Sequence, residues 1–192
     1  MALHFNQVTI IGVGLIGGSL GMILRRKGLA SKVVGVGRRV ENLKTAVQLG
    51  AIDRYVVDPK DGVREADLVV LATPVDTYDR HLTEWASCLK KGAIVTDVGS
   101  VKGLLVEQAE RAMPAGVHFV GAHPIAGKEK TGVAAGSDQL FMGARCIITP
   151  TKWTPTGMAR SACSTKRPFT LPTSVTIAPC FKQEAHSVRC RS

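Results

Sequence analysis

The chain has 192 residues, of which 45% are hydrophobic and 21% charged, and its formal net charge is +10. This composition excludes a wholly disordered chain, a collagen and a coiled coil, whereas the charge taken alone favours nucleic acid or another anionic surface as a partner. No apolar run reaches the roughly 18 residues that span a bilayer, and the first residues lack a secretory signal, so we expect a cytoplasmic protein without a membrane partner.

Short β-branched runs alternate with helix-length amphipathic stretches over the first 150 residues. This alternation is typical of βαβ units, and it predicts an α/β fold of the Rossmann type, a doubly wound parallel sheet with helices on both faces. Gly28, Gly50, Gly92 and Gly116 fall where such units turn back. We expect strands at 7–13, 32–36, 67–73, 93–97, 118–121 and 145–149, and helices at 15–27, 41–49, 77–89 and 101–113.

A glycine-rich turn follows the first expected strand and reads Gly12-Val13-Gly14-Leu15-Ile16-Gly17. In a G-x-G-x-x-G at a strand-to-helix junction, the first glycine allows the tight turn and the second lets the backbone approach a pyrophosphate. The third glycine lets helix and strand pack closely. The free N–H groups at the helix N-terminus favour an anion. The sequence therefore predicts that Gly12, Gly14, Leu15, Ile16 and Gly17 bind a dinucleotide.

The end of the second expected strand bears on the choice of cofactor. An Asp or Glu is expected there if the ribose 2′-hydroxyl is bound, but Gly37 stands in its place and Arg38 and Arg39 follow. Two arginines suit a 2′-phosphate, so we expect both to bind NAD(P), with a preference for NADP. The alternative is that they begin a solvated helix.

Three segments follow later strands at the edge where ligands of open parallel sheets lie. Thr73 and Pro74 line the nicotinamide ribose, or they only begin a helix, with Thr73 and Asp76 as a capping box. Ser100 either caps the next helix or turns its hydroxyl toward a substrate or an imidazole. His123 alone among the five histidines lies in a Gly/Pro-rich loop at a strand's carboxyl end, where it can take a proton from an alcohol.

The last fifth of the chain differs in composition from the rest. Residues 1–156 hold 19 of the 25 Lys and Arg and 14 of the 15 Asp and Glu, so half of the net charge falls in residues 157–192. Cys163, Cys180 and Cys190 match neither a zinc site nor a disulfide framework, and His186 is a weak fourth ligand. We therefore expect no metal.

These segments together resemble the N-terminal domain of the prephenate and arogenate dehydrogenase family. The glycine turn alone occurs in many dehydrogenases, but the serine-bearing and histidine-bearing segments in this order are close to diagnostic of the family. The resemblance covers residues 7 to about 156 and rests on the segments 12–19, 72–75, 96–102, 123–127, 132–133, 140–144 and 148–151.

The resemblance implies oxidative decarboxylation of prephenate or arogenate in tyrosine biosynthesis, with hydride transfer from C4 of the substrate to NAD(P)+. It also implies that His123 hydrogen-bonds the C4 hydroxyl and that Ser100 supports the histidine and the substrate. A full-length member has a helical C-terminal domain that forms a homodimer, and the sequence after Thr156 does not resemble it. We therefore expect an NAD(P)-binding domain at 1–156 and, at 157–192, an irregular tail translated out of frame or else a divergent one.

Three other functions compete with this one. A cofactor-binding fragment without turnover is the main alternative, because half of the substrate cleft would be missing. A nucleic-acid binder rests on charge alone and lacks a stacking platform, since aromatic residues make up only 5%, so we expect no nucleic-acid partner. A different oxidoreductase, such as a β-hydroxy-acid type, should lack the segments around Ser100 and His123.

Overall fold

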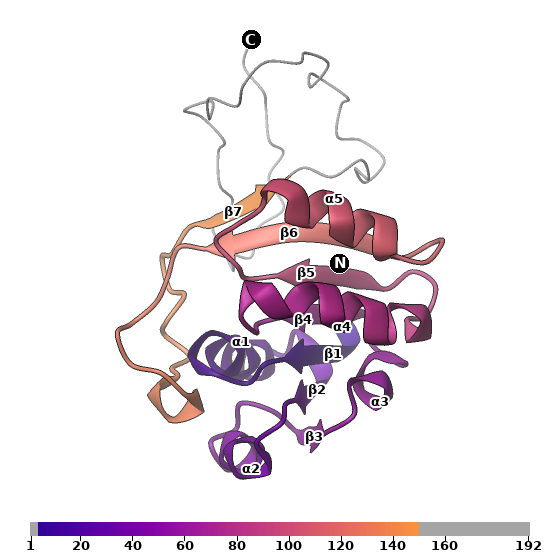
Figure 1. The fold of residues 1–192 in the computed structure, drawn as a ribbon. Helices are drawn as coiled ribbons and strands as arrows, with labels where there is room; N and C mark the ends of the chain where they lie inside the picture. Colours follow the sequence, from indigo (N-terminus) through magenta and orange to yellow (C-terminus); the bar gives the residue numbers. More distant parts are fainter. Residues whose placement is uncertain (1–3, 150–192) are drawn as a thin grey trace.

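A computed structural model describes residues 4–149, which form a seven-stranded sheet with the order β3-β2-β1-β4-β5-β6-β7 (Figure 1). Neighbouring strands are parallel from β3 to β6, whereas β7 runs antiparallel to β6. The doubly wound fold is thus confirmed, with one antiparallel edge strand that the sequence pattern did not reveal. The strands are β1 (Phe5–Ile11), β2 (Ala30–Val36), β3 (Arg54–Val56), β4 (Leu68–Leu71), β5 (Ile94–Asp97), β6 (His118–Pro124) and β7 (Cys146–Thr149).

Helices connect the parallel strands, and all four helices expected from the sequence are present. The α-helices are α1 (Leu15–Arg26), α2 (Val40–Gln48), α3 (Pro59–Val63), α4 (Tyr78–Trp85) and α5 (Gly103–Ala112), and the single 3-10 turns are η1 (Val75–Thr77), η2 (Ala86–Cys88) and η3 (Val133–Ala135). The short elements β3 and α3 were not expected. Asp58 begins α3 by accepting a hydrogen bond from the Lys60 N–H at 2.9 Å.

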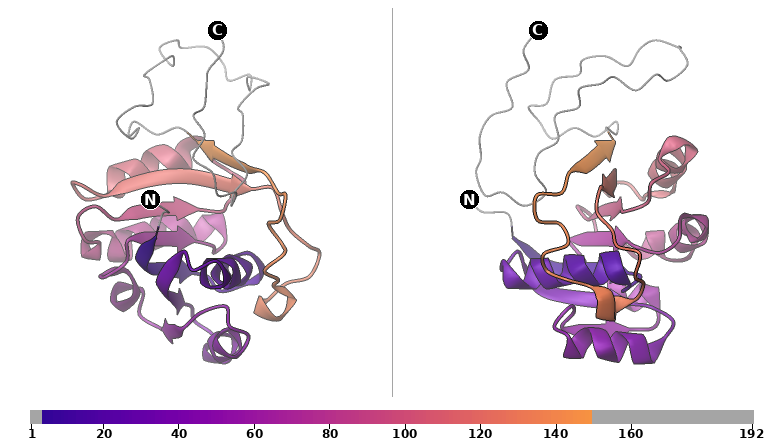
Figure 2. Two further views of the ribbon diagram at one scale, coloured as in Figure 1. Left: turned by 180° about the vertical axis from the view of Figure 1, so that it is seen from behind. Right: turned by 90° about the vertical axis from the view of Figure 1, so that its left-hand side faces the viewer.

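Helices cover both faces of the sheet (Figure 2). Each face buries its own apolar layer. Ile10 of β1 packs in the layer under α1 and α2, and its neighbour Ile11 packs in the layer under α3, α4 and α5. Because successive strand residues point to opposite faces, a strand covered on both sides is mostly apolar. β1 is buried over most of its length, and Gln7 and Thr9 are its buried polar residues. Tyr78 and Trp85 of α4 are the largest fully buried side chains among the described residues.

The long segment between β6 and β7 folds back onto α1. Ser19 of α1 is fully buried, and its Oγ accepts a hydrogen bond from the Ser137 N–H at 2.9 Å. Arg26 forms an ion pair with Asp138 at 2.6 Å. A Cβ at Gly18 would lie 2.8 Å from a methyl group of Val133, so the glycine is needed for this close approach. The segment that follows β6 is therefore tied to the first helix.

No helix in residues 4–149 is long and apolar enough to cross a membrane. The same residues contain no group of three or more His, Cys, Asp or Glu side chains that could hold a metal ion. The expected boundary near residue 156 and the segment 157–192, with Cys163, Cys180, Cys190 and His186, lie outside the described residues.

Candidate functional site

The residues singled out in the sequence gather at one edge of the sheet. Strands β1, β2, β4, β5 and β6 are parallel, so their carboxyl ends share that edge. The glycine turn follows β1, Arg38 follows β2, Thr73 follows β4, and Ser100 follows β5, while His123 lies near the end of β6. The strand order reverses between β1 and β4, and ligands of open α/β sheets bind at such a reversal.

The three glycines of the turn have different surroundings. Gly12 has a φ of +97°, and a Cβ there would lie 2.6 Å from the Ala72 carbonyl oxygen. A Cβ at Gly17 would lie 2.2 Å from the Gly12 carbonyl oxygen, whereas a Cβ at Gly14 would meet nothing within 4 Å. Gly12 and Gly17 are thus required by packing, and Gly14 faces open space that a pyrophosphate could fill.

The first turn of α1 offers donors to an anion in that space. Gly14 is the N-cap residue of α1 and provides no side-chain cap, and the turn contains no acidic residue. The N–H groups of Leu15, Ile16 and Gly17 lie at the start of the helix, where no intrahelical acceptor exists, and the helix dipole makes this end positive. Asn42 of α2 braces the turn by donating from Nδ2 to the Val13 carbonyl at 2.7 Å. These residues fit the phosphates of a dinucleotide.

Arg38 and Arg39 are both exposed after β2, and Arg39 is the N-cap residue of α2. Among the described residues neither arginine forms an ion pair. Burial lowers the pKa of His81 on α4, and Arg80 and Arg38 lower it further against the opposing effect of Glu84. The positive charge of Arg38 is thus felt at His81, and the preference for NADP stays a prediction.

Thr73 packs against the glycine turn, since a Cβ at Gly12 would lie 2.8 Å from its methyl group. The expected capping box with Asp76 is wrong, because the chain first forms the 3-10 turn η1. This turn brings the Thr73 hydroxyl to the Thr77 hydroxyl at 2.8 Å, and Thr77 Oγ1 donates to the Pro74 carbonyl at 2.6 Å. Thr73 and Pro74 thus form an ordered segment beside the glycine turn.

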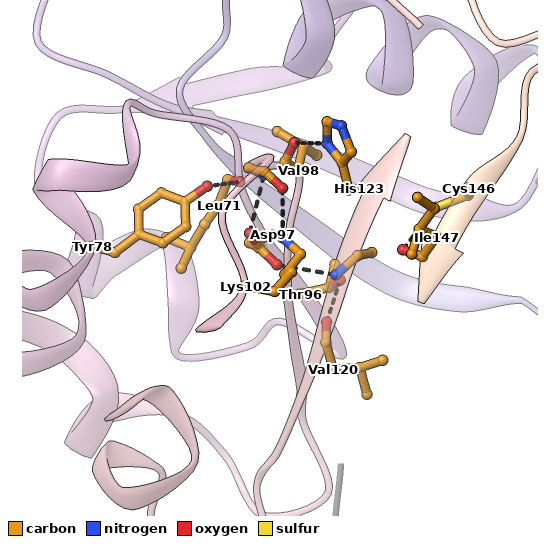
Figure 3. A network of polar contacts seen from close by, with 12 residues as sticks. Leu71, Tyr78, Thr96, Asp97, Val98, Lys102, Val120, His123, Cys146 and Ile147 are labelled. Atoms are coloured by element: carbon orange, nitrogen blue, oxygen red, sulfur yellow. Dashed lines mark hydrogen bonds and ion pairs between the residues drawn. The ribbon is translucent and has the colours of Figure 1, made fainter. Parts of the chain in front are cut away.

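Asp97, at the end of β5, is the centre of a buried polar network that sequence reasoning missed (Figure 3). Its Oδ1 accepts a hydrogen bond from the Ala122 N–H at 3.0 Å, and its Oδ2 accepts from the Gly99 N–H at 3.0 Å. Lys102 Nζ lies 2.5 Å from Oδ2 and also donates to the Gly99 carbonyl at 2.6 Å. The sequence signal that could have found this network is an Asp at the end of a buried strand, Asp97, followed five residues later by Lys102.

Tyr78 contributes a second buried polar group to the same region. Its hydroxyl donates to the Leu71 carbonyl at 3.1 Å. Burial, together with the negative charge of Asp97, raises the pKa of Tyr78 far above its ordinary value. The phenol therefore stays neutral and braces the end of β4 against α4.

His123 is half-buried in β6 and is paired with Ile147 of β7. The expectation that it lies in a loop is wrong, because antiparallel pairing with β7 extends β6 to Pro124. The His123 Nδ1 lies 3.2 Å from the Val98 carbonyl oxygen. A carbonyl only accepts, so Nδ1 is the donor and Nε2 keeps the lone pair that can take a proton.

Ser100 is exposed, and it lies in the same loop as Val98, the partner of His123. The alternative that it caps the next helix is wrong: α5 begins at Gly103, its N-cap residue is Lys102, and no side chain caps it. The structure therefore brings the Ser100 loop to His123 and leaves the serine hydroxyl without a capping role.

The glycine turn, the positive helix end and the strand reversal define a dinucleotide-binding domain of the Rossmann type. Comparison with known families identifies it further. The sequence model of the prephenate dehydrogenase nucleotide-binding domain matches residues 20–164. The chain belongs to the prephenate dehydrogenase family.

Relatives and solved structures agree with this assignment. Prephenate dehydrogenase of Bacillus subtilis (strain 168) is 37% identical over 146 residues, which are 76% of this chain and 39% of the relative. Prephenate dehydrogenase of Aquifex aeolicus, solved with hydroxyphenyl propionate and NAD+, is 40% identical with a TM-score of 0.73. That match covers 81% of this chain and 54% of the solved one. Synechocystis arogenate dehydrogenase is 33% identical with a TM-score of 0.71, over 78% of this chain and 52% of that one. The chain thus spans about half or less of the length of these proteins.

Proposed function

We propose that this chain carries the cofactor-binding half of an enzyme that oxidatively decarboxylates prephenate or arogenate in tyrosine biosynthesis, with NADP+ preferred over NAD+. Family membership supports the reaction class. The observation that carries the proposal is the placement of His123, with Nδ1 engaged by the Val98 carbonyl and Nε2 left as an acceptor, at the same sheet edge as the glycine turn.

The cofactor would be held by the glycine turn and by the neighbouring segment of Thr73 and Pro74. The N–H groups of Leu15 and Ile16 would bind the pyrophosphate in the open space at Gly14, with Gly12 and Gly17 shaping the turn. Thr73 and Pro74 would line the nicotinamide ribose, and Arg38 and Arg39 would pair with the 2′-phosphate. When bound, the nicotinamide supplies the acceptor for the hydride that leaves C4 of the substrate.

His123 and Ser100 would act on the substrate hydroxyl. His123 Nε2 accepts a hydrogen bond from the C4 hydroxyl and takes its proton as the carbonyl forms. The Nδ1–H bond to Val98 fixes the ring orientation that this step needs. Ser100 donates its hydroxyl to the substrate or to His123. Release of the ring carboxylate as CO2 is driven by aromatisation, so these side chains mainly orient the reacting groups.

A second candidate function is cofactor binding without turnover. It is favoured by the coverage of the relatives, since the chain spans only 39% of the B. subtilis enzyme. In this case the nucleotide site would be complete while the groups that hold the substrate carboxylates would be missing.

An assay of the 192-residue chain separates the two candidates. Prephenate and arogenate are each supplied with NADP+ or NAD+, and the formation of reduced nicotinamide is followed alongside the cofactor dissociation constant. We expect substrate-dependent turnover that falls by about 100-fold or more in His123→Asn, as for loss of a general base, at unchanged cofactor affinity. Cofactor binding without turnover would establish the second candidate, and failure to bind either dinucleotide would refute both.

A full-length member of the family is proposed to be a cytoplasmic homodimer with small-molecule partners only. A separate apolar edge in the described part of this chain supports self-association of the 192-residue chain itself: Ile147 and Ile148 of the edge strand β7 are 41% and 53% exposed. Sedimentation of the 192-residue chain tests this edge, and we expect self-association that weakens in Ile148→Lys. A stable monomer at all concentrations would contradict it.

A further inference from the structure

Two groups bound by the Asp97 carboxylate lie directly before the proposed catalytic residues. The Gly99 N–H precedes Ser100, and the Ala122 N–H precedes His123; each donates to Asp97 at 3.0 Å. One side chain thus bridges the two chain segments that carry the chemistry.

The bridge lies where the β5–β6 ladder stops. The pairing of β5 with β6 ends at Thr96 and Val120, where the Thr96 hydroxyl also donates to the Val120 carbonyl at 2.7 Å. Beyond that point β6 pairs with β7 instead. The bond from Ala122 to Asp97 therefore continues the link between β5 and β6 past the last paired residues, as far as the residue before His123.

Lys102 completes the arrangement. The Asp97 side chain is fully buried and that of Lys102 is 15% exposed, so each charge needs the other as a partner. Lys102 Nζ also donates to the Gly99 carbonyl, which fixes the loop before Ser100 from a second side. The Asp97 side chain is fully buried and its carboxylate is bound by these chain segments, so we take it to act through the segments that it holds.

We infer that Asp97 is a positioning residue, whose carboxylate sets the placement of Ser100 and His123 relative to each other. The inference rests on the proposed function, because it takes these two residues as the catalytic pair. Lys102 acts with Asp97 as its neutralising partner.

The chain supplies a matched control at the opposite ends of the strands, where β4 begins. Asp67 precedes β4, accepts hydrogen bonds from the Asn6 and Gln7 N–H groups at 2.5 and 3.0 Å, and pairs with Lys90 Nζ at 2.5 Å. Asp67→Asn thus removes the same kind of bridge as Asp97→Asn, away from Ser100 and His123. A merely structural role for Asp97 predicts that both variants lose stability and behave alike in every other respect.

The first measurement is the NMR order parameter of the His123 ring in the 192-residue chain. In Asp97→Asn we expect it to fall clearly below its wild-type value, toward the values under about 0.6 that flexible groups show. The His118 ring at the start of β6 and the whole Asp67→Asn variant should show no such change. The double variant Asp97→Asn, Lys102→Met leaves no unpaired buried charge, so it keeps the experiment informative if the single variant unfolds. An unchanged His123 order parameter in a folded variant would overturn the inference.

The second measurement is turnover, where the wild-type chain has it. In Asp97→Asn we expect kcat to fall about 100-fold, as for a displacement of about 1 Å, with KM and the cofactor dissociation constant within about threefold. Asp67→Asn should keep kcat within about threefold. Equal losses of kcat in both variants would overturn the positioning role. A wild-type chain without turnover refutes the proposed reaction for this chain, and the ring measurement then decides the role of Asp97 alone.

Discussion

The glycine turn allows a paired substitution that separates folding from cofactor binding. Gly14 and Gly17 are three residues apart, yet a Cβ at Gly14 meets nothing within 4 Å and a Cβ at Gly17 lies 2.2 Å from the Gly12 carbonyl oxygen. Gly14→Ala therefore fills space that the folded chain leaves open, and Gly17→Ala forces the helix away from the strand turn.

The expected magnitudes follow from these contacts. Gly14 is the N-cap residue of α1 without a side-chain cap, so alanine there should cost less than about 1 kcal/mol of unfolding free energy. At Gly17 the overlap is with backbone, which cannot turn aside, so we expect a loss of about 3 kcal/mol or more. If the Gly14 methyl displaces the pyrophosphate from two N–H groups, at roughly 1.5 kcal/mol each, the dissociation constant rises by about 100-fold.

Urea unfolding and a fluorescence titration with NADP+ and NAD+ measure the two effects on the same samples. We expect Gly14→Ala to unfold close to the wild type and to bind both dinucleotides weakly, and Gly17→Ala to unfold at clearly lower urea. Wild-type affinity in Gly14→Ala would refute the placement of the pyrophosphate at this turn. A stability loss in Gly14→Ala equal to that in Gly17→Ala would refute the packing argument.

Three further outcomes are expected. Arg38→Ser should raise the dissociation constant for NADP+ by about tenfold, as for one lost charge-assisted bond, and leave that for NAD+ unchanged; equal affinities for both in the wild type would contradict it. Burial raises the pKa of Asp67, but Lys90 and two backbone N–H groups outweigh burial and lower this pKa below its ordinary value of 3.8. The ionised carboxylate therefore stabilises the fold above pH 3.8, and this stabilisation is lost as the pH falls through the pKa of the folded state. The free energy of unfolding, measured with urea, should therefore fall more steeply between about pH 5 and 2 in the wild type than in Asp67→Asn. Parallel curves for the two proteins would contradict this. Ser19→Ala should lower the free energy of unfolding by about 1 kcal/mol, because the Ser137 N–H loses its acceptor. Ser31→Ala, at an exposed contact with His4, should lower it by less than about 0.5 kcal/mol. Equal losses would exclude the Ser19 hydrogen bond as the cause.

The sequence predicts the elements whose signals are local. The G-x-G-x-x-G turn, the buried strands and the four longer helices follow from residue patterns within about a dozen positions, and each is found close to its expected place. The shared edge of Ser100 and His123 was also predictable, because parallel strands bring their carboxyl ends together.

Features decided by contacts between distant segments could not be read in this way. β3 has three residues and α3 has five, which is too short for a periodic signal. The antiparallel direction of β7 depends on a path of more than 20 residues back across α1, and it is this pairing that turns His123 from a loop residue into a strand residue. Two partners of Asp97, Gly99 and Lys102, lie in the loop after β5, but the third, Ala122, lies on β6, 25 residues further along the chain. No short window of the sequence therefore contains all three.

The segment between β6 and β7 connects the strand that carries His123 with the helix α1 that begins at the glycine turn. It leaves β6 just after His123 and contacts α1 through the Ser137–Ser19 hydrogen bond and the Asp138–Arg26 ion pair. α1 is also the helix whose first turn faces the expected pyrophosphate. The hydrogen bond is part-buried and the ion pair is more exposed, and both restrain movement of this segment relative to α1. In the proposed reaction, this link would set the imidazole and the pyrophosphate site relative to each other before a ligand binds, and a reaction governed by orientation requires such preorganisation.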